Sequence, residues 1–301
     1  MSFWPHLFTR SKSGFILVLG GGGGRGLAHI GVLDALEEYG LRPDILVGSS
    51  VGSLVATMYA QQPEPKLLKE RTLNFLNSKS FHRLTLPVFN HLREMPIESW
   101  LERLSAVARQ SVLYGRAVTS NAIADKDVLF QLLQELGVSG SFSKLHIPVQ
   151  MVSTIFPQGG MAVFSSGDLN TSLAASMAIP TIFPPVNIAG QRYVDGGVYA
   201  DIPVLHAQNI ASKRQCVVAV NAGSRRLGMH DPVNVLGMLD WVVDAQSQQL
   251  RERDFLHADV LIEPDIHSRL WYDFSHPEKV IHTGYQAMML KMPALLKLLG
   301  A

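Results

Sequence analysis

The stretch GFILVLGGGGGRGLAHIGVLDAL, residues 14–36, decides the fold of this chain. Residues 15–19 form a short apolar run typical of a buried strand, five glycines follow it, and an apolar pattern with helical spacing comes next. A glycine-rich turn between a strand and a helix presents backbone N–H groups, which bind negative charge. The question is therefore which negatively charged group this loop binds.

Two phosphate-binding motifs fit the loop incompletely. A P-loop ends in Gly-Lys-Ser/Thr, and no lysine follows these glycines. Gly21, Gly23 and Gly26 match the dinucleotide fingerprint, but that fold also places an acidic residue at the end of the second strand to hold a ribose. Here Asp44 lies at the first position of the second predicted strand, which is the wrong end, and serines follow the strand. Nucleotide binding is therefore the least favoured function.

The serine motif is Gly48-Ser49-Ser50-Val51-Gly52, between a strand predicted at 44–48 and a helix predicted at 51–61. Gly-x-Ser-x-Gly in this position is the pattern of a nucleophile elbow. The glycines allow the tight turn, and Ser50 projects from it above the positive end of the helix. The glycine loop and the serine turn follow neighbouring strands, so both are expected at the same edge of the sheet. The glycine N–H groups would then face the carbonyl that Ser50 attacks and form an oxyanion hole.

A serine nucleophile needs a base, and Asp195 is the candidate that the sequence favours. It ends a strand predicted at 191–195, and Gly196-Gly197 then turn the chain. We expect this strand end at the carboxyl edge of the sheet, where poorly solvated surroundings raise the pKa of a carboxyl group and let it act as a base. The chain has 11 histidines, none in a comparably marked setting, and His206 is the first alternative.

The three motifs in this order resemble the patatin-like phospholipase family, in the branch of bacterial relatives of neuropathy target esterase. Residues 175–186, ASMAIPTIFPPV, also resemble the family's Ala-Ser-x-x-x-Pro block. The resemblance implies a Ser–Asp dyad, an acyl-enzyme intermediate and hydrolysis of lipid acyl esters without a metal or other cofactor. It implies the following site residues: Ser50 as nucleophile, Asp195 as base, the N–H groups of Gly22, Gly23 and Gly24 as oxyanion hole, and Gly21, Arg25, Gly26, Gly48, Gly52, Gly196 and Gly197 as supporting motif residues. The chain departs from many relatives in having Asp201 where they have Asn.

Short β-branched runs that alternate with longer helical patterns predict an α/β fold, with a mostly parallel central sheet flanked by helices in three layers and a helical C-terminal extension. Strands are expected at 15–19, 44–48, 147–154, 161–165, 191–195, 216–221 and 259–263, and helices at 25–39, 51–61, 64–77, 97–109, 127–136, 168–177, 203–211, 234–256 and 278–299. The predicted divisions are a tail at 1–13, a catalytic domain at 14–225 with a helical insertion at 62–126, and a mainly helical extension at 226–301 packed on the core.

Composition limits the partners and the cellular compartment that we expect for the protein. A net charge of +1 over 301 residues argues against nucleic-acid binding, and the single cysteine, Cys216, excludes an intramolecular disulfide and fits a reducing compartment. No signal-peptide pattern and no run of 18 apolar residues occurs. We therefore expect a cytoplasmic protein with a lipid or acyl-ester substrate, and peripheral contact with the inner membrane surface stays open, as does the oligomeric state.

Several segments leave alternatives open. Residues 62–116 hold nine Lys or Arg against five Glu, which suits either an ordinary helical insertion or a cap that meets an anionic lipid surface. Apolar residues in 75–115 are expected to line an acyl groove. Arg25 either fixes the shape of the loop or binds a phosphate headgroup, and the acidic and histidine residues of 257–267 have spacings that do not favour a metal site. A non-catalytic scaffold that retains the fold is the alternative to an enzyme.

Overall fold

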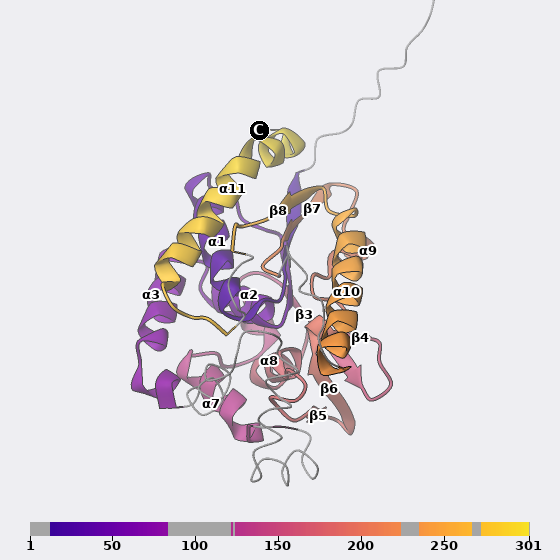
Figure 1. Ribbon diagram of the computed structural model, residues 1–301. Coiled ribbons are helices and arrows are strands. Elements are labelled where there is room, and N and C mark those ends of the chain that lie inside the picture. The colour runs from indigo at the N-terminus through magenta and orange to yellow at the C-terminus, as the bar shows by residue number, and fades with distance from the viewer. Residues whose placement is uncertain (1–12, 84–121, 123, 224–234, 267–271, 301) are drawn as a thin grey trace, which may run out of the picture.

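A computed structural model of the protein describes residues 13–83, 122, 124–223, 235–266 and 272–300 (Figure 1). Within them, eight strands form one sheet of order β5-β6-β3-β2-β1-β7-β8, with β4 paired to β3. The strands are β1 (Gly14–Leu19), β2 (Ile45–Ser49), β3 (Val149–Phe156), β4 (Met161–Phe164), β5 (Val186–Ile188), β6 (Gln191–Asp195), β7 (Gln215–Val220) and β8 (Val260–Ile262). Seven were expected from the sequence; β5, of three residues, was not.

The helices lie close to their predicted ranges. They are α1 (Ala28–Glu38), α2 (Val51–Gln61), α3 (Pro65–Leu76), α7 (Lys126–Glu135), α8 (Leu169–Met177), α9 (Val204–Ile210), α10 (Val235–Phe255) and α11 (Pro277–Leu299), with short 3-10 turns η1 (Gly23–Leu27), η2 (Phe142–Lys144) and η3 (Gly196–Val198). The start of the helix predicted at 25–39 is instead the tight turn η1, because the glycine loop continues into it. The helix predicted at 97–109 lies outside the described residues.

Helices cover both faces of the sheet, which confirms the three-layer arrangement. Phe15, Leu17 and Leu19 of β1 are buried in the cluster that contains α1, α2, α3, α7 and α11. Ile16 and Val18 point to the opposite face and are buried with residues of α9 and of the end of α10 (Figure 1). Alternate residues of a strand face opposite sides, so burial on both sides explains the unbroken apolar run at 15–19.

The sheet is mostly parallel, as predicted, but one edge is antiparallel. Neighbouring strands in β3-β2-β1-β7-β8 run parallel, whereas β4 and β6 run antiparallel to β3, and β5 runs antiparallel to β6. The link between β5 and β6 consists of Ala189 and Gly190, both with positive φ, at 51° and 87°. Such a two-residue turn joins only antiparallel strands, because a parallel connection needs a long crossover.

The chain after residue 225 contributes to the sheet and the core. β8 pairs with β7, and α11 crosses α1 so closely that a Cβ at Gly31 would meet the carbonyl of Ile281, and one at Gly284 the carbonyl of Ala28.

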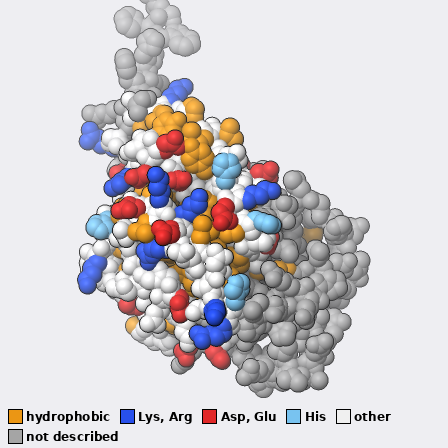
Figure 2. Space-filling view, turned by 90° about the vertical axis from the view of Figure 1, so that its left-hand side faces the viewer, with side chains coloured by type: hydrophobic (Ala, Val, Ile, Leu, Met, Phe, Trp, Pro, Cys, Tyr) orange, Lys and Arg blue, Asp and Glu red, His pale blue; other side chains and the backbone are white. Residues whose placement is uncertain are grey.

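On the face where α3 and α11 lie, Figure 2 shows basic and acidic side chains interspersed. None of the described helices is long and apolar enough to cross a membrane. The predicted domain division at 225 stays a prediction.

Candidate active site

Ser50 lies in a sharp turn between β2 and α2, the elbow that the sequence predicts. Its φ is 53° and ψ is −126°, a conformation that a non-glycine residue rarely adopts. A Cβ at Gly48 would lie 2.5 Å from the backbone nitrogen of Ser53, and one at Gly52 would overlap the carbonyl of Leu19. Backbone atoms cannot move aside as a side chain can, so both positions require glycine for steric reasons.

Ser50 and Asp195 meet across 145 residues of sequence. The Ser50 hydroxyl donates to Oδ2 of Asp195 at 2.6 Å, and Oδ1 of the same carboxyl group accepts the Gly197 N–H at 2.7 Å. Burial raises the pKa of Asp195 to about 7, against the two hydrogen bonds, which lower it, and nearby Asp201 raises it further. A carboxyl group with this pKa is half ionised near neutral pH, which suits proton transfer.

Asp195 reaches Ser50 by a different route from the expected one. β6 runs antiparallel to β3, so its end is not the carboxyl end of a parallel strand. β3 is longer than β2: Ser49 of β2 lies opposite Val152, and the register of β6 begins just beyond, with Asp195 opposite Ser153. β6 therefore descends along the projecting part of β3 and ends at the carboxyl edge, beside the elbow.

The glycine loop lies next to Ser50 and is anchored at its start. The N–H groups of Gly20 and Gly21 donate to the carbonyls of Val220 and Asp201, at 3.2 and 2.9 Å. Gly23 borders the same cavity as Ser50. Gly22, Gly23 and Gly24 come at the start of the 3-10 turn η1, where the first N–H groups have no acceptor within the turn and can bind a ligand.

The loop is also packed from both sides, which gives a second reason for its glycines. A Cβ at Gly22 would lie 2.5 Å from the carbonyl oxygen of Ala222, and one at Gly24 would lie 2.5 Å from that of Asp273. Arg25 is buried and donates Nε–H to the Gly22 carbonyl at 3.2 Å, the geometry expected of a residue that fixes the shape of the loop.

A cluster of buried hydroxyl groups supports the elbow, and the sequence did not reveal it. Ser176 of α8 accepts the Ser50 N–H at 3.2 Å, donates to the Val152 carbonyl at 2.6 Å and contacts the Ser53 hydroxyl at 2.8 Å. Ser176 is the serine of the Ala-Ser block at 175–186, so the sequence marked this residue but did not indicate what it contacts. These contacts fix the backbone of Ser50 where its side chain meets Asp195.

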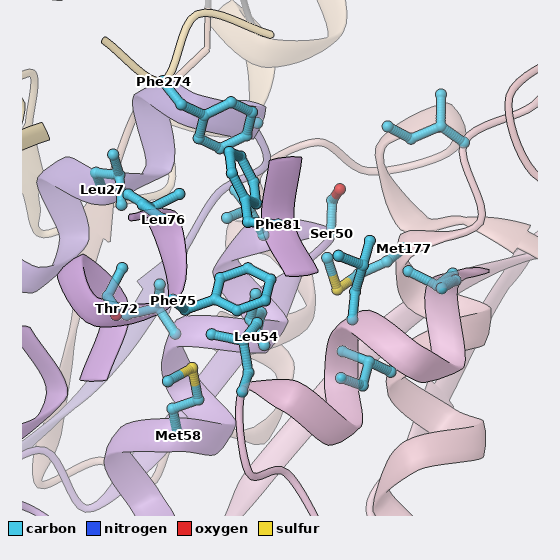
Figure 3. Close-up of a pocket in the computed structure, with 18 of the residues that line it drawn as sticks. Leu27, Ser50, Leu54, Met58, Thr72, Phe75, Leu76, Phe81, Met177 and Phe274 are labelled. Carbon is cyan, nitrogen blue, oxygen red and sulfur yellow. The ribbon is translucent and has the colours of Figure 1, made fainter. Parts of the chain in front are cut away.

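An apolar cavity of about 160 Å³ opens beside Ser50 (Figure 3). Ser50 and Thr72 contribute its only hydroxyl groups among the described residues, and Thr72 donates its own to the Leu68 carbonyl. The other residues of the wall are apolar or glycine: Gly23, Leu27, Ile30, Val51, Leu54, Val55, Met58, Phe75, Leu76, Phe81, Val128, Leu129, Leu132, Leu133, Leu136, Met177, Ile179, Ile182, Phe183 and Phe274.

The acyl groove was expected from residues 75–115, of which Phe75, Leu76 and Phe81 do line the cavity. Residues 84–115 lie outside the described part of the chain. Most of the observed wall comes from α2, α7 and the segment 177–183, whose apolar residues resemble ordinary core positions in the sequence.

Other candidate residues have structural partners. His206 hydrogen-bonds to the Gln150 side chain at 2.5 Å, and His29 contacts the Gly20 carbonyl at 2.8 Å. Asp259 accepts the Val217 N–H at 2.7 Å, at the start of β8. The described residues contain no group of three or more His, Cys, Asp or Glu side chains that could hold a metal ion.

This combination defines a class of protein: a three-layer α/β fold with a serine elbow, a partner carboxyl group, a glycine loop and an apolar cavity at one sheet edge. The chain belongs to the patatin-like phospholipase family, whose model matches residues 17–207.

Curated relatives and solved structures agree with this membership. Patatin-like phospholipase domain-containing protein ZK370.4 of Caenorhabditis elegans is 31% identical over 212 residues, and patatin-like phospholipase domain-containing protein 6 of Mus musculus is 29% identical over 211. Lysophospholipase NTE1 of Candida glabrata is 28% identical over 213 residues. Each match covers 69% of this chain but only 10–13% of the relative, so this chain corresponds to a small part of those proteins.

The fold is shared with more distant proteins of known structure. VipD from Legionella pneumophila matches with a TM-score of 0.51 and 16% identity, over 95% of this chain and 67% of that one. Human GIVD cytosolic phospholipase A2 matches with a TM-score of 0.50 and 11% identity, over 96% of this chain and 60% of that one. At these identities the likeness concerns the fold alone.

Proposed function

We propose that this protein is a serine hydrolase that cleaves acyl esters of lipids, of phospholipase or lysophospholipase type, through a Ser50–Asp195 dyad. The observation that carries the proposal is the 2.6 Å hydrogen bond from the Ser50 hydroxyl to Asp195, made beside an apolar cavity. A hydroxyl group bonded to a carboxylate of raised pKa is an activated nucleophile, and an apolar cavity binds an acyl chain. The lysophospholipase name of several relatives supports the substrate class.

In the proposed reaction, Ser50 Oγ attacks the ester carbonyl carbon and passes its proton to Oδ2 of Asp195. The carbonyl oxygen becomes an oxyanion, which the N–H groups of Gly22, Gly23 and Gly24 stabilise, at about 3–4 kcal/mol for each donor. The intermediate collapses to an acyl-enzyme as the leaving alcohol takes the proton from Asp195. Water then attacks the acyl group with Asp195 again as base, which releases the fatty acid and restores Ser50.

The proposal is tested with a panel of soluble acyl esters and a lysophospholipid, assayed on the wild type and on Ser50→Ala. We expect release of fatty acid by the wild type and a loss of at least about 10³-fold in Ser50→Ala, because removing the nucleophile removes the covalent route. The matched control is Ser49→Ala, one residue earlier in the elbow; its buried hydroxyl has no hydrogen-bond partner among the described residues.

Equal hydrolysis by Ser50→Ala and the wild type would contradict the nucleophile assignment. Hydrolysis of no ester by a folded wild-type protein would instead favour the non-catalytic scaffold.

A further inference from the structure

Asp201, the residue that departs from the Asn of many relatives, lies at the edge of the candidate site. Its backbone carbonyl accepts the Gly21 N–H at 2.9 Å, so it anchors the glycine loop directly. Its carboxyl group faces the same loop, since a Cβ at Gly21 would overlap Oδ1. The side chain is 21% exposed, so its charge is only partly screened by solvent.

The carboxyl groups of Asp201 and Asp195 lie close together. A Cβ placed on Gly197 would be 3.0 Å from Oδ1 of Asp195 and 3.4 Å from Oδ1 of Asp201. The two oxygens therefore lie at most about 6.4 Å apart, close enough for one carboxylate to oppose ionisation of the other. Burial is the main cause of the raised pKa of Asp195, and the negative charge of Asp201 raises that pKa further.

Arg251 of α10 balances that charge. Its guanidinium group forms an ion pair with Oδ2 of Asp201 at 3.3 Å, and its side chain is 17% exposed. Other ionisable groups near the site have different partners: Glu263, just after β8, accepts from the Asn221 amide at 3.4 Å, and His29 and Arg25 bond to carbonyls of the glycine loop. Within the part of the chain that the structure describes, Arg251 is thus the cation that pairs with the carboxylate facing the dyad.

We infer that the Arg251–Asp201 ion pair belongs to the active site, where Arg251 cancels the charge of Asp201 and so lets Asp195 lose its proton at neutral pH. The inference rests on the proposed function. Both are positioning residues, because they act on substrate only through Asp195 and the glycine loop. Arg251 lies beyond residues 17–207, so a helix outside the region matched by the family model completes the site.

The test is the rate at which a fluorophosphonate probe labels the full-length protein between pH 5 and 9. Labelling needs ionised Asp195, so the wild-type rate should rise with pH through a midpoint near 7. Arg251→Gln leaves Asp201 unbalanced and should raise the midpoint by about one unit, which slows labelling about tenfold at pH 6. Asp201→Asn should lower the midpoint by about half a unit or more.

The double variant decides between charge and structure. Arg251→Gln with Asp201→Asn leaves a neutral pair, and its midpoint should return to within about 0.3 units of the wild type. Arg251→Lys keeps the positive charge, so its midpoint should also lie within about 0.3 units of the wild type. If Arg251→Gln folds poorly, Arg251→Lys and Asp201→Asn still test the effect of the charges. Arg42→Gln is the matched control, since Arg42 forms an ion pair of the same 3.3 Å length with Glu37 on an exposed surface.

Coincident midpoints in all variants, or shifts of both single variants in the same direction, would overturn the inference. A wild-type protein that the probe does not label, or equal labelling of Ser50→Ala, would overturn the proposed function and the inference with it. The two failures are therefore distinguishable.

Discussion

The proton on Asp195 is the single feature on which the proposed chemistry depends. Asp195 is 5% exposed, and its carboxyl group accepts hydrogen bonds from both the Ser50 hydroxyl and the Gly197 N–H. Each contact favours the ionised form, while burial favours the neutral form and prevails. The result is a carboxyl group able both to take the proton of Ser50 and to return it to a leaving group.

Asp195→Asn should therefore reduce ester hydrolysis by about 10²–10⁴-fold while the protein stays folded, because the amide has the same shape but accepts no proton. The measurement is kcat/KM for a soluble ester, with circular dichroism as the check on folding. Asp44→Asn is the matched control, since Asp44 bonds to Gln215 on the surface. A near-normal rate in Asp195→Asn would point to another base, with His206 the first to test.

Single residues were predictable where a local motif marks them. Ser50 and Asp195 each lie in a short pattern with glycines whose steric role the structure explains. Ser176 and Arg251 have no such pattern. Their partners lie 126 and 50 residues away, so only the tertiary fold brings them to the site.

At the scale of elements, α2 both presents Ser50 and forms one wall of the cavity. Val51, Leu54, Val55 and Met58 line the cavity with the spacing of one helix face. Of these four residues, Met58 lies farthest from Ser50 along α2. Eight residues at 1.5 Å each place it about 12 Å from Ser50 along the helix axis. Figure 3 shows it at the opposite side of the cavity from Ser50, and it is 2% exposed.

We therefore predict that Met58→Trp shortens the acyl chain that the protein accepts. The larger side chain would fill the end of the cavity, so the hydrolysis rate for a twelve-carbon ester should fall about tenfold relative to a four-carbon ester. The ratio within one variant cancels any loss of folded protein. Met238→Trp, on the exposed side of α10, is the control. An unchanged ratio in Met58→Trp would show that the acyl chain lies elsewhere.

Periodicity was enough to place the described helices and most strands, because burial on one or both faces leaves a pattern in the sequence. It did not show the direction of β4, β5 and β6, which depends on turn geometry. It also did not show that α7 and the segment 177–183 surround a cavity. Apolar residues around a cavity and apolar residues in a core look alike until the elements are assembled.

At the scale of the whole molecule, the site has a cost in stability. The pKa of Asp195 is about 7 in the folded protein, against 3.8 ordinarily. Between these values the folded protein holds a proton that the unfolded chain releases, so stability falls as the pH rises through this window. Above pH 7 the full cost of ionising Asp195 applies, on the order of a few kcal/mol.

Asp195→Asn removes this cost, so its free energy of unfolding should exceed that of the wild type at pH 8 by about 1–3 kcal/mol. The difference should shrink to roughly half a kcal/mol near pH 4, where the carboxyl group is protonated in the folded protein and close to half protonated in the unfolded chain. Urea unfolding at the two pH values measures it, with Asp44→Asn again as control. A difference that is larger at pH 4 than at pH 8 would contradict the raised pKa.

The overall architecture followed from the sequence more fully than the role of its last third. A strand at 259–263 and a helix at 278–299 were expected, and β8 and α11 lie there. Their place at the edge of the sheet and against α1 was not, since it depends on the close approach at Gly31 and Gly284. Neither glycine stands out in a single sequence.

The central claim, that Ser50 forms the covalent bond to the acyl group, is tested most directly by locating a fluorophosphonate adduct by peptide mass spectrometry. Wild type, Ser50→Ala, Ser49→Ala and Asp195→Asn are treated in parallel at pH 8. We predict one adduct on Ser50 in the wild type and Ser49→Ala, much slower formation in Asp195→Asn, and none in Ser50→Ala. An adduct on a different residue of the wild type, or undiminished labelling of Ser50→Ala, would contradict the account.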